Sequence, residues 1–179
     1  MINKSSQKSK VFCLIPTHNR LKKLKKIINK LQAQIYKNLQ IVITDDGSSD
    51  GTGQYLKTLP KKKIKIIKGD GNLWWGGSIN AGIKYVNSKA KKDDYVLFLN
   101  DDVEFDKKFI FKQVSYLKKN KNIILGPITR DLKTKKIISG GTRINFFTCR
   151  MLSALEKKEE YFADTAPARG VIFSINILR

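Results

Sequence analysis

The sequence has few acidic residues, little histidine or cysteine and no long apolar run, and each shortage excludes a class of protein. Its 179 residues include 15 acidic residues against 36 basic ones, one histidine and two cysteines. A membrane-spanning helix needs roughly 18 consecutive apolar residues, and no run approaches that length. The first ten residues are polar and basic, without the apolar stretch of a signal peptide. We therefore expect a single cytoplasmic domain over 1–179 with its own apolar core.

Several catalytic and metal-binding patterns are also missing. Cys13 and Cys149 form no CxxC pair, so each is predicted to be a buried thiol rather than a metal ligand. His18 is the only histidine, and no G-x-S-x-G nucleophile elbow accompanies it. Neither a dinucleotide-binding G-x-G-x-x-G after the first strand nor a phosphate-binding G-x-x-x-x-G-K-[ST] loop is present. These absences argue against triad hydrolases, dinucleotide enzymes and P-loop proteins.

The formal net charge is +21, and it comes mostly from lysine. Such a field favours polyanions, which include nucleic acid, anionic lipid headgroups and phosphate-bearing substrates. The lysines are scattered in short runs through the whole chain, without the interleaved aromatic residues expected of a single-strand binder. Two interpretations stay open at this point: a solvated lysine-rich surface, or a basic polyanion-binding protein. We expect no specific nucleic-acid partner.

Strand and helix patterns alternate along the chain. Apolar runs typical of buried strands occur at 10–16, 39–44, 63–69, 93–102 and 122–128, with a further strand and turn at 136–147. Helical patterns occur at 17–34, in a short stretch through Leu56 that Ser49 or Asp50 can cap, from about Ser78 to Ala90, and at 107–120. Thr17 or Asn19 is the expected cap of the first helix. The alternation predicts an α/β fold, a mostly parallel sheet with helices on both faces.

Polar residues gather where the predicted strands end. They are Pro16–Arg20 after the first strand, Asp45–Asp50 after the second, Gly69–Gly77 after the third and Asn100–Asp102 after the fourth. In open α/β sheets, ligands bind in a crevice at the carboxyl ends of the strands. We therefore predict that all four loops open onto one crevice.

Asp101 and Asp102 stand side by side at the end of a predicted buried strand. Two adjacent carboxylates repel, so a positive group is expected between or beside them. Neighbouring strand residues point to opposite sides, so at most one of the two is expected to be a direct metal ligand. A lone carboxylate with ligand phosphates and water suits Mg²⁺ or Mn²⁺. The alternative is structural, because Asp102 and Asp106 both precede a predicted helix and can cap it.

Two other groups carry the same ambiguity. Asp45, Asp46 and Asp50 form a second carboxylate cluster, which can accept hydrogen bonds from a base or a ribose, although aspartate is also an ordinary turn residue. Trp74 and Trp75 offer flat apolar surface that suits a sugar face, although plain packing explains them equally well.

Four stretches in this order, "LIPTHNR", "IVITDDGSSDGT", "GNLWWGGSINAGI" and "YVLFLNDDV", resemble inverting glycosyltransferases of family two. The resemblance covers roughly residues 10–130, the nucleotide-sugar-binding half of the Rossmann-like GT-A fold, with 131–179 as the start of the acceptor half. It implies an enzyme that moves a sugar from a UDP- or dTDP-linked donor to a glycan or polyprenyl-linked acceptor, with Mg²⁺ or Mn²⁺ as cofactor. The third stretch resembles bacterial members that build surface polysaccharides.

The resemblance also implies roles for residues. Asp102 would ligate the metal, Asp101 would face the ribose or a metal-bound water, and Asp46 would accept from the base. The complete set that it assigns to the nucleotide-sugar site, besides Asp102 as the metal ligand, is Pro16, Thr17, His18, Arg20, Asp45, Asp46, Gly76, Gly77, Asn80, Asn100 and Asp101.

The chain departs from the family pattern in its last third. "DTAPARGVIFSINILR" resembles the turn and strand that open the acceptor half, but Ala168 stands where the family has glycine. Asp164 is the last carboxylate of the sequence and the only late candidate for the general base. Two interpretations of the resemblance therefore stay open: an active transferase, peripheral at the inner face of the plasma membrane, or a truncated and inactive nucleotide-sugar-binding domain.

Overall fold

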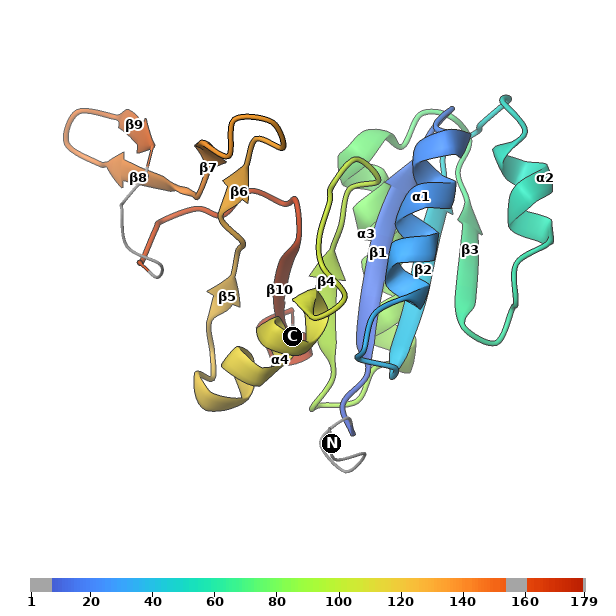
Figure 1. Cartoon of the computed structure of the whole chain (residues 1–179), viewed down its shortest axis with the longest axis horizontal. Coiled ribbons are helices and arrows are strands. Elements are labelled where there is room, and N and C mark those ends of the chain that lie inside the picture. The colour runs from blue at the N-terminus through green and yellow to red at the C-terminus, as the bar shows by residue number, and fades with distance from the viewer. Residues whose placement is uncertain (1–7, 154–160, 179) are drawn as a thin grey trace.

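The computed structural model describes residues 8–153 and 161–178, which form one α/β unit around a six-stranded sheet (Figure 1). The strands, in the spatial order β3-β2-β1-β4-β10-β5, are β3 (Ile64–Lys68), β2 (Leu39–Asp45), β1 (Val11–Thr17), β4 (Tyr95–Phe98), β10 (Val171–Ser174) and β5 (Ile124–Leu125). The helices are α1 (Leu21–Gln32), α2 (Thr52–Lys57), α3 (Trp74–Lys89) and α4 (Phe109–Lys119). The α/β prediction is confirmed: β1 pairs in parallel with β2 and β4, and β2 with β3.

Alternate residues of β1 divide the core into two layers. Val11, Cys13 and Ile15 belong to the cluster that α1, α2 and α4 cover, while Phe12 and Leu14 belong to the cluster that α3 covers. Figure 1 shows α1 in front of the sheet and α3 behind it. Because β1 is buried on both faces, its apolar run is continuous rather than alternating, as is usual for a central parallel strand.

Helix α1 has the predicted amphipathic pattern, but the residue that caps its start differs from the prediction. Leu24, Ile27, Ile28 and Leu31 are buried at spacings of three and four, and lysines occupy the opposite face. Neither Thr17 nor Asn19 caps the helix, because Thr17 still belongs to β1 and the Asn19 carboxamide accepts from Ser49. The cap comes from another loop: Asp50 Oδ2 accepts from the Leu21 amide at 2.9 Å.

The same Asp50 also serves α2, as predicted. Its Oδ1 accepts from the amide and the hydroxyl of Thr52, at 3.1 and 2.6 Å. One carboxylate therefore joins the starts of two helices, which fixes the loops after β1 and β2 against each other. Asp106 accepts from the Lys108 amide just before α4, whereas Asp102 makes no such capping bond there.

Helix α3 begins at Trp74, one turn earlier than the predicted Ser78. Two consecutive glycines weaken a helix on propensity alone, so the prediction began after them. The Gly77 amide nevertheless donates to the Leu73 carbonyl at 2.9 Å, and the first turn is held from outside, as described below. Glycine is also needed later in this helix, where a Cβ on Gly82 would lie 2.8 Å from Leu14 on β1.

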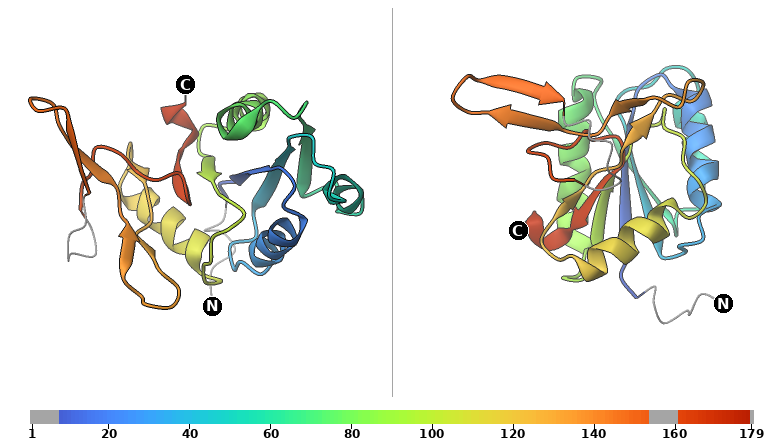
Figure 2. Two further views of the ribbon diagram at one scale, coloured as in Figure 1. Left: turned by 90° about the horizontal axis from the view of Figure 1, so that it is seen from above. Right: turned by 60° about the vertical axis from the view of Figure 1, so that its left-hand side comes forward.

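The last third of the chain differs most from the prediction. β10 runs antiparallel between β4 and β5, and the fifth strand, predicted over 122–128, is reduced to Ile124–Leu125. The predicted strand and turn at 136–147 correspond to β7 (Ile137–Ser139), which pairs with β6 (Thr129–Arg130), and to β8 (Thr142–Asn145), which pairs with β9 (Arg150–Ser153). Figures 1 and 2 show the β8–β9 hairpin extending away from the main sheet.

Cysteine placement is as predicted at one of its two positions. Cys13 lies in the middle of β1 and is fully buried, and this burial raises the pKa of its thiol to about 12. Cys149 is exposed in the β8–β9 turn, so the prediction of a buried thiol there is wrong. Across the residues that the structure describes, no helix is long and apolar enough to cross a bilayer.

Candidate functional site

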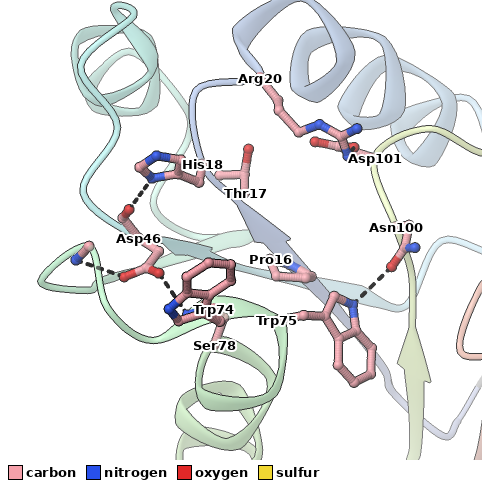
Figure 3. Close-up of a pocket in the computed structure, with 11 residues that line it drawn as sticks. Pro16, Thr17, His18, Arg20, Asp46, Trp74, Trp75, Ser78, Asn100 and Asp101 are labelled. Atoms are coloured by element: carbon pink, nitrogen blue, oxygen red, sulfur yellow. Dashed lines mark hydrogen bonds and ion pairs between the residues drawn. The ribbon is translucent and has the colours of Figure 1, made fainter.

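The loops after β1, β2 and β4 meet the start of α3 around a cavity of about 300 Å³, drawn in Figure 3. The cavity lies at the carboxyl ends of the parallel strands, where the sequence predicted a crevice. Its lining residues are Pro16, Thr17, His18, Arg20, Asp46, Gly71, Trp74, Trp75, Ser78, Asn100 and Asp101. Seven of these stand in the predicted set, so the four loops do converge.

Asp46 organises one side of the cavity. Its Oδ1 accepts from the Gly71 amide at 2.8 Å, and its Oδ2 accepts from the Trp74 amide at 2.9 Å (Figure 3). Burial tends to raise the pKa of this carboxyl, but the surrounding backbone amides of Leu73, Trp74 and Gly71 outweigh burial and hold the pKa below its usual range. The carboxylate therefore closes the 70–74 turn and starts α3. A bound base would have to use the remaining lone pairs of the same oxygens.

His18 is held in one orientation beside Asp46. Its Nδ1 contacts the carbonyl oxygen of Asp46, and its Nε2 lies 3.0 Å from the Asn19 side-chain nitrogen. A carbonyl only accepts, so Nδ1 carries the proton and donates, while Nε2 accepts from the Asn19 amide group. Both ring nitrogens are thus used by the protein, which leaves the flat face of the imidazole as the part available to a ligand.

The opposite side of the cavity carries the acidic pair and its counter-charge. Arg20 Nη1 donates to Asp101 Oδ1 at 2.7 Å, and Nη2 lies 3.6 Å from Asp102 Oδ2. The positive group expected beside the pair is therefore Arg20, from the loop after β1. Burial raises the pKa of the Asp101 carboxyl above its ordinary range, although the Arg20 guanidinium opposes the shift.

Three polar atoms at the cavity are buried and lack a hydrogen-bond partner in the described part of the chain. They are Thr17 Oγ1, Ser78 Oγ and Asp101 Oδ2. A buried polar group without a partner is costly, so these atoms mark places where a polar ligand would recover hydrogen bonds.

Trp75 spans the cavity from α3 to the end of β4. Its indole Nε1 donates to Asn100 Oδ1 at 3.1 Å (Figure 3), and its ring meets Phe98 edge-on at 6.4 Å between centroids. Asn100 is thereby oriented with its carboxamide oxygen toward the indole.

Five predicted site residues lie outside the cavity lining. Asp45 is buried and accepts from the Ser48 amide at 3.2 Å. Asp102 is exposed and lies beside Arg20, next to the lining. The other three, on α3, are Gly76, Gly77 and Asn80.

Gly71 and Ser78, by contrast, line the cavity and were missed by the sequence analysis. Ser78 could have been found from the sequence, because it stands four residues after Trp74 and so shares its helix face.

Asp164 lies in a different place from the acidic pair. It lines a second cavity of about 1080 Å³ between α4, β5 and residues 161–166, and its Oδ2 accepts from the Ile144 amide at 2.7 Å. Two other buried atoms at this second cavity, Gln113 Oε1 and Tyr161 Oη, also lack a partner among the described residues.

The donor set at the first cavity suits a hard divalent cation that is completed by its ligand. Across residues 8–153 and 161–178, no group of three or more His, Cys, Asp or Glu is arranged to hold a metal alone. Mg²⁺ is commonly bound by one or two carboxylates together with substrate phosphates and water. Asp101 and Asp102 supply such carboxylates, and the unpartnered Asp101 Oδ2 is free to take part.

Proteins with similar sequences include bacterial glycosyltransferases. An uncharacterized glycosyltransferase of Rickettsia prowazekii is 34% identical over 118 residues, which cover 64% of this chain and 35% of that protein. GalNAc(5)-diNAcBac-PP-undecaprenol beta-1,3-glucosyltransferase of Campylobacter jejuni is 32% identical over 98 residues, 53% of this chain and 30% of its own length. This chain thus spans about a third of these relatives.

Two solved structures share the fold at low identity. The mannosyltransferase PcManGT from Pyrobaculum calidifontis, in complex with GDP-Man and Mn²⁺, superposes with a TM-score of 0.66 and 13% identity over 96% of this chain and 47% of that one. S. aureus TarS 1–349 in complex with UDP gives a TM-score of 0.61 and 20% identity over 72% of this chain and 38% of that one.

The sheet, its flanking helices and the position of the cavity define a GT-A glycosyltransferase fold. Residues 12–178 match the family Glycosyl transferase family 2, and the chain belongs to that family.

Proposed function

We propose that this chain carries the donor site of an inverting, metal-dependent glycosyltransferase that uses a UDP- or dTDP-linked sugar. The observation that supports it best is the cavity itself, which joins Asp101 and Arg20 at one end to flat rings and a carboxylate at the other. A nucleoside diphosphate has the matching sequence of groups: a charged diphosphate at one end and a flat, hydrogen-bonding base at the other.

Different residues along the cavity would contact different parts of the donor. Asp102 would hold Mg²⁺ or Mn²⁺, with Asp101 toward the ribose or a metal-bound water, and that ion would supply Lewis-acid stabilisation of the charge on the departing diphosphate. Arg20 would release part of its pairing with the acids and turn toward the phosphates. Pro16 and the face of His18 would border the base, with Thr17 and Ser78 as hydrogen-bonding hydroxyls and Asn100 near the sugar.

The glycines and Asn80 at the start of α3 would lie by the sugar or the diphosphate. Gly76 and Gly77 lie on α3 between Trp75 and Ser78, which line the cavity, and Asp45 supports the loop that carries Asp46. In this proposal, 10–130 form the nucleotide-sugar-binding half and 131–179 the start of the acceptor half.

Transfer with inversion is a single displacement. The acceptor hydroxyl oxygen bonds to the anomeric carbon, the bond from that carbon to the diphosphate oxygen breaks, and a general base takes the hydroxyl proton. Asp164 is the late-chain candidate for this base, at the wall of the second cavity. The name of the Campylobacter relative gives an undecaprenol-linked substrate, and we propose a glycan or polyprenyl-linked acceptor here in surface polysaccharide synthesis.

The β8–β9 hairpin supports a contact with anionic membrane, where such acceptors would reside. Between Asp131 and Glu156 the sequence has five basic residues and no acidic one. The hairpin also exposes large apolar side chains: Phe146, Phe147, Met151 and Leu152. Basic residues attract anionic headgroups, and exposed aromatic side chains insert at the interface. We therefore propose that the chain docks peripherally at the cytoplasmic face.

Calorimetric titration of UDP and dTDP, with and without Mn²⁺, tests the donor site. The wild-type chain should bind better with the metal, and Asp102→Asn should lose that gain. Asp93→Asn is the matched control, because Asp93 is an exposed carboxylate at the other end of β4. Binding that ignores both Mn²⁺ and Asp102 would remove the metal assignment. Binding of every polyanion with a steep salt dependence would favour a polyanion-binding protein instead.

Sugar transfer needs a test of its own, separate from donor binding. Loss of Asp102 should abolish any release of UDP from a UDP-sugar in the presence of an acceptor. A chain that binds UDP with Mn²⁺ and releases none would be a binding domain without transferase activity.

A further inference from the structure

Trp74 has a backbone conformation that its side chain does not favour. Its φ is +54°, in the left-handed region that glycine and asparagine occupy far more readily than bulky residues. It is also the first residue of α3, where an ordinary helical φ would be expected. Residues held in such conformations cluster at ligand sites, where surrounding contacts maintain them.

Asp46 is the contact that maintains this conformation. Its Oδ2 accepts from the Trp74 amide at 2.9 Å, while its Oδ1 accepts from the Gly71 amide at 2.8 Å, so both ends of the 71–74 turn are attached to one carboxylate. Asp46 is itself buried at the end of β2. The strained residue is therefore anchored to a buried carboxylate at the end of β2.

This backbone conformation places an exposed indole at the cavity. The Trp74 side chain is 81% exposed, yet it lines the cavity beside Asp46, as Figure 3 shows. Trp75 is 43% exposed and is fixed on the other side by Asn100. Burial of apolar surface does not explain why Trp74 has a strained backbone, since most of its ring stays in contact with solvent.

Charged side chains at one end of the cavity and aromatic ones at the other indicate which part of a ligand the Trp74 indole faces. Arg20 and Asp101 occupy one end, with Asp102 beside Arg20, and suit a diphosphate with its cation. Trp74 stands toward the other end with His18 and Asp46, where rings and a hydrogen-bond acceptor suit a nucleobase (Figure 3). Base–aromatic stacking contributes substantially to nucleotide affinity, because every base has a flat face.

We infer that Trp74 is the base-binding residue of the donor site, and that its indole stacks on the nucleobase while Asp46 holds the strained backbone that turns the ring into the cavity. This inference rests on the proposed nucleotide-sugar function. It assigns the base end of the ligand to Trp74 and leaves the diphosphate end to Arg20, Asp101 and Asp102.

Ligands with and without a base test the inference. UDP and inorganic pyrophosphate, each with Mn²⁺, are titrated into the wild type, Trp74→Gly and Trp74→Phe. Glycine adopts a positive φ freely, so Trp74→Gly removes the ring without adding strain, and its thermal unfolding midpoint should not fall. We expect Trp74→Gly to weaken UDP binding by about five- to a hundred-fold and to leave pyrophosphate binding unchanged. Trp74→Phe keeps a ring and should retain most of the UDP affinity.

Fluorescence supplies a second readout, because Trp74 and Trp75 are the only tryptophans in the chain. UDP should quench the emission of Trp75→Phe, in which only Trp74 remains, more than that of Trp74→Phe. Equal losses of UDP and pyrophosphate affinity in Trp74→Gly, or an unchanged UDP affinity, would overturn this inference and leave the proposed function standing. If the wild type binds no UDP or dTDP, the proposed function fails, and this inference fails with it.

Discussion

At the scale of single residues, the site depends on a few side chains that each hold two loops. Asp46 joins β2 to the start of α3, Asp50 joins the starts of α1 and α2, and Arg20 joins the loop after β1 to the loop after β4. The sequence placed all three in the correct loops, since each follows a predicted strand. It could not supply their partners, because a hydrogen bond across 28 or 81 positions of the chain leaves no local pattern.

Replacing Asp46 with asparagine tests the contact between β2 and the start of α3. A carboxamide has one accepting oxygen, so either the Gly71 or the Trp74 amide loses its partner, and the thermal unfolding midpoint at neutral pH should fall. The native pKa of Asp46 is lowered, so its stabilising contribution is present above the unfolded value of about 3.9 and is lost as pH falls through the native value. The difference between wild type and variant should therefore shrink below about pH 4.

The measurement is the unfolding midpoint of both proteins from neutral to strongly acidic pH. Asp70→Asn is the matched control, because Asp70 lies in the same turn, is exposed and accepts from one amide, that of Asn72. A difference between Asp46→Asn and wild type that stays constant at every pH would show that the charge of Asp46 does not stabilise the turn.

At the scale of elements, periodicity predicted the helices and strands of the first two thirds, and boundaries failed where distant groups decide them. The buried stripe of α1 is visible in the sequence, but its cap is Asp50, 29 positions away. The start of α3 was predicted too late because Gly76 and Gly77 have low helix propensity, while the Asp46 carboxylate that stabilises the first turn belongs to another loop.

Two glycines of α3 should respond to alanine in opposite directions. A Cβ at Gly82 would lie 2.8 and 2.9 Å from Cδ2 and Cγ of Leu14, which is buried in the core. Gly82→Ala should therefore lower the free energy of unfolding by about 1–3 kcal/mol. A Cβ at Gly76 would meet nothing within 4 Å, so Gly76→Ala should raise it by about 0.5–1 kcal/mol. Urea unfolding of both variants gives the two values, and destabilisation by both would mean that α3 does not begin at Trp74.

At the scale of the whole molecule, the positive charge and the exposed apolar hairpin would both contribute to the proposed membrane contact. A positive field alone would give binding to any polyanion, whereas insertion of aromatic side chains requires a lipid interface. The sequence revealed the charge, but the position of the aromatic pair at the hairpin turn depends on the β8–β9 register, in which Asn145 pairs with Arg150.

Co-sedimentation with vesicles separates these contributions. The wild type should bind vesicles that contain anionic lipid and should bind neutral vesicles far less. Phe147→Ser should weaken binding to anionic vesicles, because Phe147 is fully exposed at the turn. Phe162→Ser is the control, an exposed phenylalanine outside the hairpin. If both variants bind like wild type and binding falls steeply with salt, the contact is purely electrostatic and the hairpin does not insert.

The position of β10 has a consequence for how the protein is made. β10 (Val171–Ser174) lies between β4 (Tyr95–Phe98) and β5 (Ile124–Leu125), so two strands made earlier cannot join until a much later one emerges from the ribosome. During synthesis, the loops of the cavity can form around β1, β2 and β4 while one edge of β4 stays unpaired. Pairing across such long sequence separations is slow. We therefore expect the part of the chain that contains the first cavity to fold first, with closure of the sheet as the late step of folding.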